Sequence, residues 1–184
     1  FVGGAKTFPS AIFIQTKDGF IKQDQEVFVE DQEGEDLGGV IFDVDQDGDN
    51  DLYVVKGGYE FEFKPEILQD KLYLNNGEGV FSKADGNALP KMLVSGSRAY
   101  NADFDKDGKE DLLVLGRQVP GKYPLPAKSF ILKNSSKEGK VKFEEYPTPL
   151  GNQLDSLGMA TSAVITDFNN DDRLDIMIVG EWMP

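Results

Sequence analysis

A nine-residue acidic pattern occurs three times in this chain and constrains its fold more than any other feature. The copies are DVDQDGDND, DFDKDGKED and DFNNDDRLD, which begin at residues 43, 103 and 167. We call them the first, second and third acidic loops and count each from its first aspartate as position 1. Self-similarity at a period of about 60 residues is the signature of a repeat architecture. The sequence therefore predicts successive copies of one supersecondary unit.

Two further patterns keep the phase of the acidic loops. Each loop is followed by a short apolar run that ends at glycine: LYVVKGG, LLVLG and IMIVG. A strand, a glycine-containing turn and a second strand are indicated at 10–22, 70–83 and 128–145. Asp18-Gly19 and Asn76-Gly77 are typical of hairpin turns, because these residues tolerate positive φ. One repeat therefore contains two hairpins.

The fold class that follows is all-β. Four antiparallel strands in each repeat are the content of one propeller blade, so we expect a β-propeller fragment of about three blade-equivalents. Runs 52–55, 112–115 and 176–179 are apolar without alternation, as in strands buried on both faces. A β-sandwich of short strands is the alternative. The fixed period favours the propeller.

The repeat phase also divides the chain. Residues 1–35 are expected to be the second half of a blade, and residues 156–184 the first half of another. Complete blades are expected at 36–95 and 96–155. Propellers typically have four or more blades, so we expect these residues to be part of a longer chain.

Composition excludes several classes of function. The chain has no cysteine and no histidine, which removes disulfides, thiolate nucleophiles, imidazole bases and Cys- or His-ligated metals. A net charge of −14 argues against a nucleic-acid partner, which requires a basic surface. No stretch approaches the roughly 18 apolar residues of a membrane-spanning helix.

The acidic loops have the donor pattern of a calcium site. Side-chain oxygens recur at positions 1, 3, 5 and 9, and the glycine at position 6 of the first two loops permits a sharp turn. The backbone carbonyl of position 7 is expected to be a further ligand. Oxygen-only ligation from a flexible loop suits Ca²⁺, whereas Mg²⁺ demands stricter octahedral geometry. The candidate side-chain ligands are Asp43, Asp45, Asp47 and Asp51; Asp103, Asp105, Asp107 and Asp111; and Asp167, Asn169, Asp171 and Asp175. The candidate carbonyl ligands are those of Asp49, Lys109 and Arg173.

Two other interpretations of the loops are less favoured. An EF-hand needs a glutamate at position 12 and flanking helices, but position 12 is Val54, Val114 or Ile178 and the flanks are rich in β-formers. A solvated acidic turn is the other alternative, because Asp, Asn and Gly favour turns. Three loops in register argue against it. The apolar residue at position 2 (Val44, Phe104 or Phe168) is expected to pack into the core.

The charge balance agrees with bound cations. The side-chain positions carry eleven carboxylates, and without these the net charge of −14 would be only −3. The third loop is expected to bind calcium least tightly. Asn169 replaces a carboxylate there, and Asp172 replaces the turn glycine.

Together the three loops, the GVIFDVDQDGDNDLYVV context and the LYLNNGEGVF hairpin resemble the FG-GAP or VCBS repeat family. This family of calcium-loop β-propellers includes the heads of integrin α-subunits. Segments 116–134 and 175–184 look more like bacterial VCBS-repeat proteins related to the cartilage acidic protein family. The resemblance implies a seven- or eight-bladed propeller in the full protein, structural calcium, and export or surface attachment. Millimolar extracellular calcium would keep weak sites filled, which also favours an extracytoplasmic location.

Two classes of function are compatible with this scaffold. The first is a binding or scaffold module for a protein or glycan, alone or in a larger surface complex. Its candidate contact surface is Gln118–Lys128, which could equally be a rigid cover between strands. The second is a polysaccharide lyase or hydrolase whose site is completed by other blades and uses residues such as Glu144, Tyr146 and Lys122. We expect the non-enzymatic module, because no catalytic set is assembled in the sequence.

Overall fold

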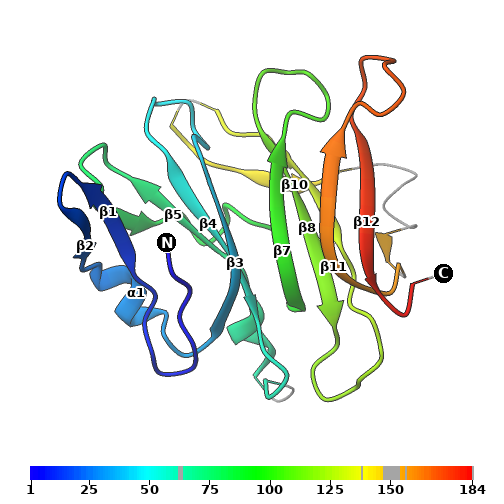
Figure 1. The fold of residues 1–184 in the computed structure, drawn as a ribbon, viewed down its shortest axis with the longest axis horizontal. Helices are drawn as coiled ribbons and strands as arrows, with labels where there is room; N and C mark the ends of the chain where they lie inside the picture. The colour runs from blue at the N-terminus through cyan, green and yellow to red at the C-terminus, as the bar shows by residue number, and fades with distance from the viewer. Residues whose placement is uncertain (62–63, 138, 147–153, 156, 184) are drawn as a thin grey trace.

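The computed structural model describes residues 1–61, 64–137, 139–146, 154–155 and 157–183 (Figure 1). Within them the protein is all-β, with four antiparallel sheets. The strands are β1 (Ile12–Thr16), β2 (Gly19–Gln23), β3 (Glu35–Phe42), β4 (Asp51–Gly57), β5 (Lys71–Asn75), β6 (Phe81–Lys83), β7 (Ser95–Ala102), β8 (Asp111–Gln118), β9 (Phe130–Asn134), β10 (Phe143–Glu145), β11 (Met159–Thr166) and β12 (Asp175–Glu181).

Two of the sheets have four strands, and two have two. One larger sheet pairs β3 to β6 in chain order, and the other pairs β7 to β10 in the same way. The hairpins β1–β2 and β11–β12 form the two smaller sheets. The larger sheets span residues 35–83 and 95–145. The expected division between residues 155 and 156 adjoins a residue outside the described ranges and stays a prediction.

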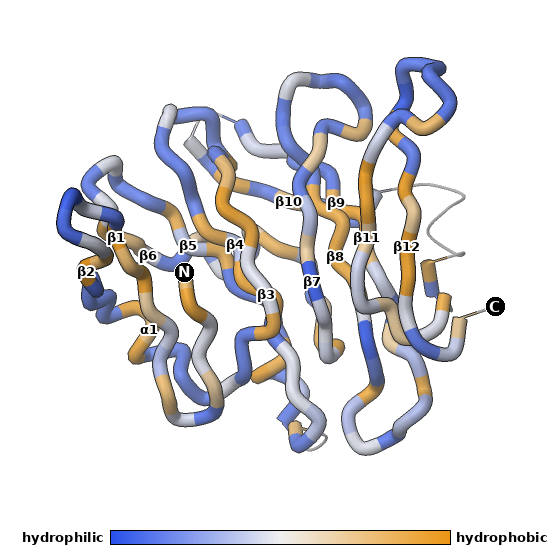
Figure 2. The backbone as a smooth tube through the Cα atoms, in the orientation of Figure 1, coloured by the Kyte–Doolittle hydropathy of each residue, from blue (hydrophilic) through white to orange (hydrophobic). Residues whose placement is uncertain are grey.

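The four sheets stack side by side along the long axis of the molecule (Figure 1). Alternate residues of β4 face opposite neighbours. Tyr53 and Val55 join a buried cluster with Leu112 and Val114 of β8. Leu52 and Val54 join a second cluster on the side of β1. In Figure 2 hydrophobic residues accordingly run along β4 and β8, while the loops at the upper edge are hydrophilic.

Burial on both faces holds for two of the three predicted strands. Residues 52–55 and 112–115 are at most 1% exposed. The expectation is wrong for β12, where Met177 is 60% exposed and Val179 is 52% exposed. Their counterparts in β8, Leu113 and Leu115, lie under β11. Among the described residues no sheet covers the corresponding face of β12, so these side chains meet solvent.

Close contact between the two larger sheets depends on a glycine in β7. A Cβ atom at Gly96 would collide with the Cγ1 atom of Val55 in β4. Packing at native density leaves no room for such an atom. The small residue at this position therefore sets the spacing of the stack.

A short helix, α1 (Glu26–Glu30), was not expected from the sequence. It places Val27 and Phe28 in the cluster beside β4, and the Phe28 ring meets the Tyr73 ring edge-on at 5.1 Å. The helix has no side-chain cap and is only five residues long, so tertiary packing stabilises it rather than local propensity. A 3₁₀ turn, Pro65–Leu68, precedes β5. No helix in the described ranges is long and apolar enough to cross a membrane.

A buried polar network joins β3, β4 and the segment before β5. The ammonium of Lys56 pairs with Asp36, and both side chains are 3% exposed. The carboxylate of Asp70 accepts hydrogen bonds from the Tyr53 hydroxyl at 2.5 Å and from the Lys56 backbone N–H at 2.8 Å. Burial raises the pKa of Asp70 to about 7, although both hydrogen bonds oppose this shift.

This pKa predicts a pH dependence for Asp70→Asn. A carboxyl group whose pKa is raised by folding contributes full stability below its unfolded pKa, near 3.8, and loses it as pH rises through about 7. The variant cannot ionise at this position. The unfolding free energy of the variant minus that of the parent should therefore increase as pH rises from 4 to 8. The gain should be at most about 1.4 kcal/mol per pH unit.

Urea unfolding of both proteins across this pH range measures the difference, and ionisations common to both cancel. Parallel stability curves for parent and variant would show that Asp70 is ionised in the fold throughout.

Candidate metal centres in the acidic loops

The three acidic loops occupy equivalent places in the fold. They connect β3 to β4, β7 to β8 and β11 to β12. All three lie at the same end of the stack, at the upper edge in Figure 1. Each loop joins two antiparallel strands, as expected for a β-hairpin site and unlike the helical flanks of an EF-hand.

The position-1 carboxylate organises each loop in the same way. In the first loop Asp43 accepts the backbone N–H groups of Asp47 at 3.2 Å and Gly48 at 3.0 Å. Asp103 accepts the corresponding groups in the second loop, and Asp167 does so in the third. The same turn therefore forms in all three sequences.

The turn needs two residues in the left-handed region. At position 6, φ is 98° for Gly48, 86° for Gly108 and 64° for Asp172. The sequence predicted this strain at Asp172. Position 4 is also left-handed, with φ of 64° for Gln46, 61° for Lys106 and 58° for Asn170. Only asparagine among these residue types favours that region, so the first two loops give no sign of it.

The position-9 carboxylate connects the first two loops to a neighbouring strand, whereas Asp175 in the third accepts the N–H of Phe168 at 2.9 Å. Asp51 is 1% exposed and accepts the N–H of Val44 at 3.0 Å and that of Asn75, on β5, at 2.8 Å. Asp111 does the same with Phe104 at 3.2 Å and with Asn134, on β9, at 2.8 Å. Each carboxylate oxygen keeps a second lone pair for another partner.

The carboxylates converge in two of the three loops. Single oxygens of Asp43, Asp45 and Asp47 lie within 4.8 Å of one another, and those of Asp103, Asp105 and Asp111 do likewise. These triplets leave out Asp51 and Asp107. Among the described residues of the third loop, Asp167, Asp171 and Asp175 form no such triplet, and Asn169 instead donates to Asp171 at 3.1 Å.

The position-7 residues also take the expected place in the turn. The backbone N–H groups of Asp49, Lys109 and Arg173 each donate to the position-5 carboxylate, at 2.9, 3.0 and 2.9 Å. Their role as carbonyl ligands stays a prediction.

The first loop contains a polar atom that a cation would satisfy. The Oδ1 atom of Asp45 is buried and has no hydrogen-bond partner among the described residues. Burial raises the pKa of Asp45, and the neighbouring Asp47 adds to the shift. Burial likewise raises the pKa of Asp51 to about 6. Crowded, desolvated carboxylates of this kind fit an oxygen-ligated divalent cation.

Electrostatics distinguish the third loop from the first. The side-chain amide of Asn169 lowers the pKa of Asp171, so this carboxylate is already paired within the loop. Asn169, Asp171 and Asp172 are all exposed. Water therefore relieves the repulsion that the first loop leaves uncompensated.

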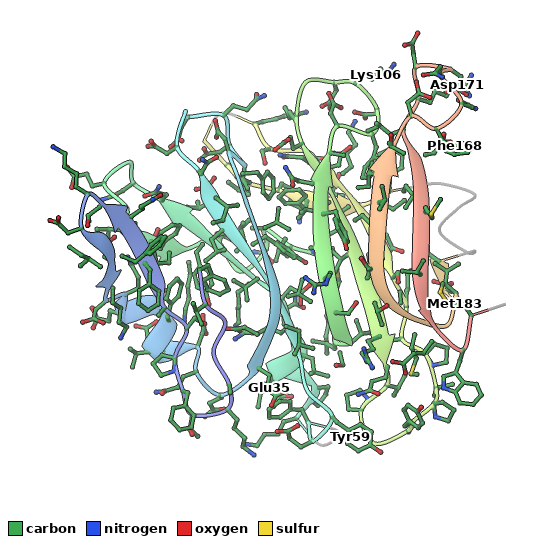
Figure 3. All side chains as sticks on the ribbon, in the orientation of Figure 1. Glu35, Tyr59, Lys106, Phe168, Asp171 and Met183 are labelled. Carbon is green, nitrogen blue, oxygen red and sulfur yellow. The ribbon has the colours of Figure 1, made fainter. Side chains whose placement is uncertain are left out.

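The expectation that position 2 packs into the core is correct for the first and second loops and wrong for the third. Val44 is 0% exposed and lies in the central cluster, which contains Tyr53 of β4 and Leu112 of β8. Phe104 packs against the cluster that contains Leu113 and Leu115 of β8. Phe168 is 77% exposed and stands out beside β12 (Figure 3). Val44 meets a neighbouring sheet, whereas the described residues provide none beside Phe168.

Neighbouring acidic loops contact each other directly. The Gln46 side-chain amide donates to the Gly108 carbonyl at 2.8 Å. The Lys106 ammonium donates to the Asp172 carbonyl one sheet further on. In both cases a position-4 side chain reaches position 6 of the next loop. These links are not evident from the sequence, because nothing in a single repeat shows which residue of the next repeat lies beside it.

The opposite end of the stack carries the candidate contact surface. The 118–128 connection is held by backbone hydrogen bonds such as Val119 N–H to Leu125 C=O at 2.9 Å. Its Tyr123 is half exposed, and the hydroxyl accepts the Trp182 indole N–H at 3.2 Å. Figure 3 places Tyr59 at this same end, away from Lys106 and Asp171.

The residues suggested for an enzyme occupy separate surroundings. Glu144 accepts a hydrogen bond from Ser135 at 3.2 Å, and Tyr146 packs against the cluster under β11. Lys122 lies in the connection after β8, where its N–H donates to Val119. Within the described ranges no hydrogen bond or ion pair connects these three residues.

Comparison with known proteins gives one family. The profile described as an FG-GAP-like repeat matches residues 43–114, from position 1 of the first loop to just beyond the second. The chain matches no curated protein. The matched segment contains both carboxylate triplets and the strands β4, β5, β6 and β7 between them.

Asp172→Gly should stabilise the third loop. Glycine adopts the left-handed backbone without the clash that an L-residue meets, so the gain should be about 1 kcal/mol in unfolding free energy. Thermal unfolding of parent and variant measures it.

The matched control is Gly108→Asp in the second loop. A Cβ atom there would meet no atom within 4 Å, so the substitution causes no steric clash. Backbone strain and the added negative charge both act against the loop, so the variant should be destabilised by at least a similar amount, and Gly108→Ala measures the strain without the charge. An unchanged midpoint in both variants would contradict the role assigned to position 6.

Proposed function

Because this chain carries an FG-GAP-like repeat, we propose that it is a calcium-stabilised β-propeller module that binds a protein or glycan outside the cytoplasm. In this proposal the chain is a binding or scaffold module and not an enzyme. The acidic loops stabilise the fold, and the opposite end of the stack meets the partner.

The convergence of three carboxylates in the first loop, together with the buried, unpartnered Oδ1 atom of Asp45, carries the calcium part of the proposal. Asp43, Asp45, Asp47 and Asp51 would hold one ion, with the Asp49 carbonyl. Asp103, Asp105, Asp107 and Asp111 would hold a second, with the Lys109 carbonyl. Asp167, Asn169, Asp171 and Asp175 would hold a third and weakest ion, with the Arg173 carbonyl. The ion supplies positive charge that offsets the repulsion within each loop.

The order and stacking of the sheets support the propeller. Two four-stranded antiparallel sheets in chain order, packed face to face, have the layout of adjacent blades. The exposed face of β12 matches the face of β8 that β11 covers, so Met177 and Val179 suit coverage by another sheet of the same kind.

Calcium availability supports the proposed location. Loops that contain an amide ligand or a strained turn, as the third does, bind calcium weakly and fill at the millimolar concentrations found outside cells. A protein stabilised by such ions would lose part of its stability in the cytosol.

The contact surface is proposed at a groove that faces away from the acidic loops and adjoins the start of the 118–128 connection, where Gln118 lines it. The groove lies between the β4, β7 and β8 ends, and Tyr59, Ser97, Arg98, Arg117 and Thr161 are among its lining residues. Tyr59 is half exposed, and Arg117 pairs with Glu181 at 3.0 Å. Glu35 and Glu60 also line the groove, so tyrosine, arginine, hydroxyl and carboxylate groups are available there for stacking and hydrogen bonding to a protein or glycan.

Calcium should raise the thermal unfolding midpoint of the chain, and EDTA should reverse the rise. Each site contributes about 2.7 kcal/mol when free calcium exceeds its Kd a hundredfold. Asp45→Asn should reduce the calcium-dependent part, because it removes a ligand charge from the first loop. Magnesium should have a smaller effect.

The control for this experiment is Asp18→Asn, in the exposed turn of β1–β2. It removes one carboxylate outside the loops and should leave the calcium response unchanged. Equal midpoints in calcium and EDTA for the parent protein would exclude structural calcium.

The partner surface is tested by substitutions at the groove. The parent chain should bind glycans on an array or a surface protein in calcium buffer. Tyr59→Ala combined with Arg117→Ala should abolish that binding without changing the response of the unfolding midpoint to calcium.

Asp18→Asn again serves as the control for partner binding. Calcium-dependent cleavage of a polysaccharide by the parent chain would contradict the non-enzymatic part of the proposal.

A further inference from the structure

Lys133, on β9, reaches the carboxylates of the second acidic loop. Its ammonium pairs with the Oδ2 atom of Asp105 and lies 3.2 Å from the Oδ2 atom of Asp107. Both aspartates are candidate calcium ligands. A fixed positive charge of the protein itself therefore contacts two members of one ligand set.

The first loop has leucine where the second has this lysine. Strand register pairs Leu52 with Tyr73 and Leu112 with Leu132, which makes Leu74 the structural counterpart of Lys133. The next residues confirm the alignment, because the N–H groups of Asn75 and Asn134 both donate to the position-9 aspartate at 2.8 Å. Leu74 packs against the central cluster instead.

The two loops differ accordingly in how their carboxylates are satisfied. No ion pair in the described residues involves Asp43, Asp45 or Asp47, and one oxygen of Asp45 has no partner. In the second loop, the equivalent Asp105 is paired with Lys133. The first loop therefore depends on an external cation more than the second does.

The lysines within the second loop do not serve this purpose. Lys106 donates to the Asp172 carbonyl in the third loop, and Lys109 donates to the Ser136 carbonyl at 2.6 Å. Both ammonium groups are directed at backbone oxygens. Among the described residues, Lys133 is thus the cation that pairs with the carboxylates at positions 3 and 5.

We propose that Lys133 is an internal counter-ion that competes with calcium for the second acidic loop. This inference rests on the proposed calcium binding and adds that the sites fill in order. Calcium reaches Asp105 and Asp107 only after their contacts with the ammonium are broken, or binds beside a like charge. The first loop therefore fills at lower calcium than the second.

The same contact keeps the second loop ordered without calcium. An ammonium at positions 3 and 5 offsets the repulsion that otherwise opens a cluster of carboxylates. Loss of calcium consequently loosens the first loop more than the second. The lysine weakens calcium binding and reduces the dependence of this loop on calcium.

Backbone amide NMR of the whole chain during a calcium titration tests the order of filling. The N–H groups of Gly48 and Gly108 donate to the position-1 carboxylates at 3.0 and 2.9 Å, so each responds to its own loop. The Gly108 carbonyl also accepts a hydrogen bond from Gln46 of the first loop, so the decisive comparison is that of Gly108 between the parent and Lys133 variants, which share this contact. In the parent chain the Gly48 signal should respond at lower calcium than the Gly108 signal.

Two reciprocal substitutions test the role of the lysine. Lys133→Met keeps the stem, removes the charge and should lower the calcium midpoint of Gly108 about fivefold, as expected for a partly exposed ion pair. Leu74→Lys should raise the midpoint of Gly48. Lys140→Met removes the same charge from the exposed β9–β10 turn and should change neither.

The outcomes separate this inference from the proposed function. A shift of the Gly108 midpoint with Lys133→Met but not with Lys140→Met supports the counter-ion. Equal Gly108 midpoints in the parent and Lys133→Met proteins overturn it, while calcium binding stands. If neither glycine responds to calcium in any variant, the proposed calcium binding fails and the counter-ion fails with it.

Discussion

The hydrogen bonds of a buried aspartate at position 9 organise the first two acidic loops and their sheets. Asp51 and Asp111 each connect the start of an acidic loop to the end of the third strand of the same sheet, through two backbone N–H groups. Loop, hairpin and neighbouring strand are thereby held by one carboxylate. Its negative charge is desolvated beside other carboxylates, which makes a nearby cation favourable and couples the sheet to whatever supplies that charge.

Similar loop sequences resolve this electrostatic problem in three ways. In the first loop three carboxylates converge and one oxygen of Asp45 has no partner, so the repulsion there is left for an external cation to offset. The second brings in Lys133 from β9, and the third relies on Asn169 and on exposure to water. Because the cost of crowding carboxylates depends on burial and on neighbouring charge, near-identical ligand patterns should have different calcium affinities. The loops are also linked in series through Gln46 and Lys106, so each adjoins the next.

Much of the architecture could be predicted from the sequence. The period located the acidic loops and hairpins, and the placement of Asp and Gly identified the turn that all three loops form. These features are local, because positions 1 to 9 close on themselves through short-range hydrogen bonds. The family match over residues 43–114 agrees with the resemblance seen in the residues, whereas the propeller, the bound calcium and the location outside the cytoplasm remain proposals.

The hairpins, the acidic turn and the candidate ligands depend on residue type and local spacing, so they could be predicted from the sequence. Which charges meet depends on the packing of the sheets. Lys133 lies far along the chain from Asp105, and the repeat pattern does not show that it contacts this aspartate while its counterpart Leu74 packs against the core. The stack likewise buries Val44 and leaves Phe168 exposed at the same loop position, because only one of them has a neighbouring sheet. Desolvation and ion pairing depend on what lies across the sheet, and a sequence position does not contain that information.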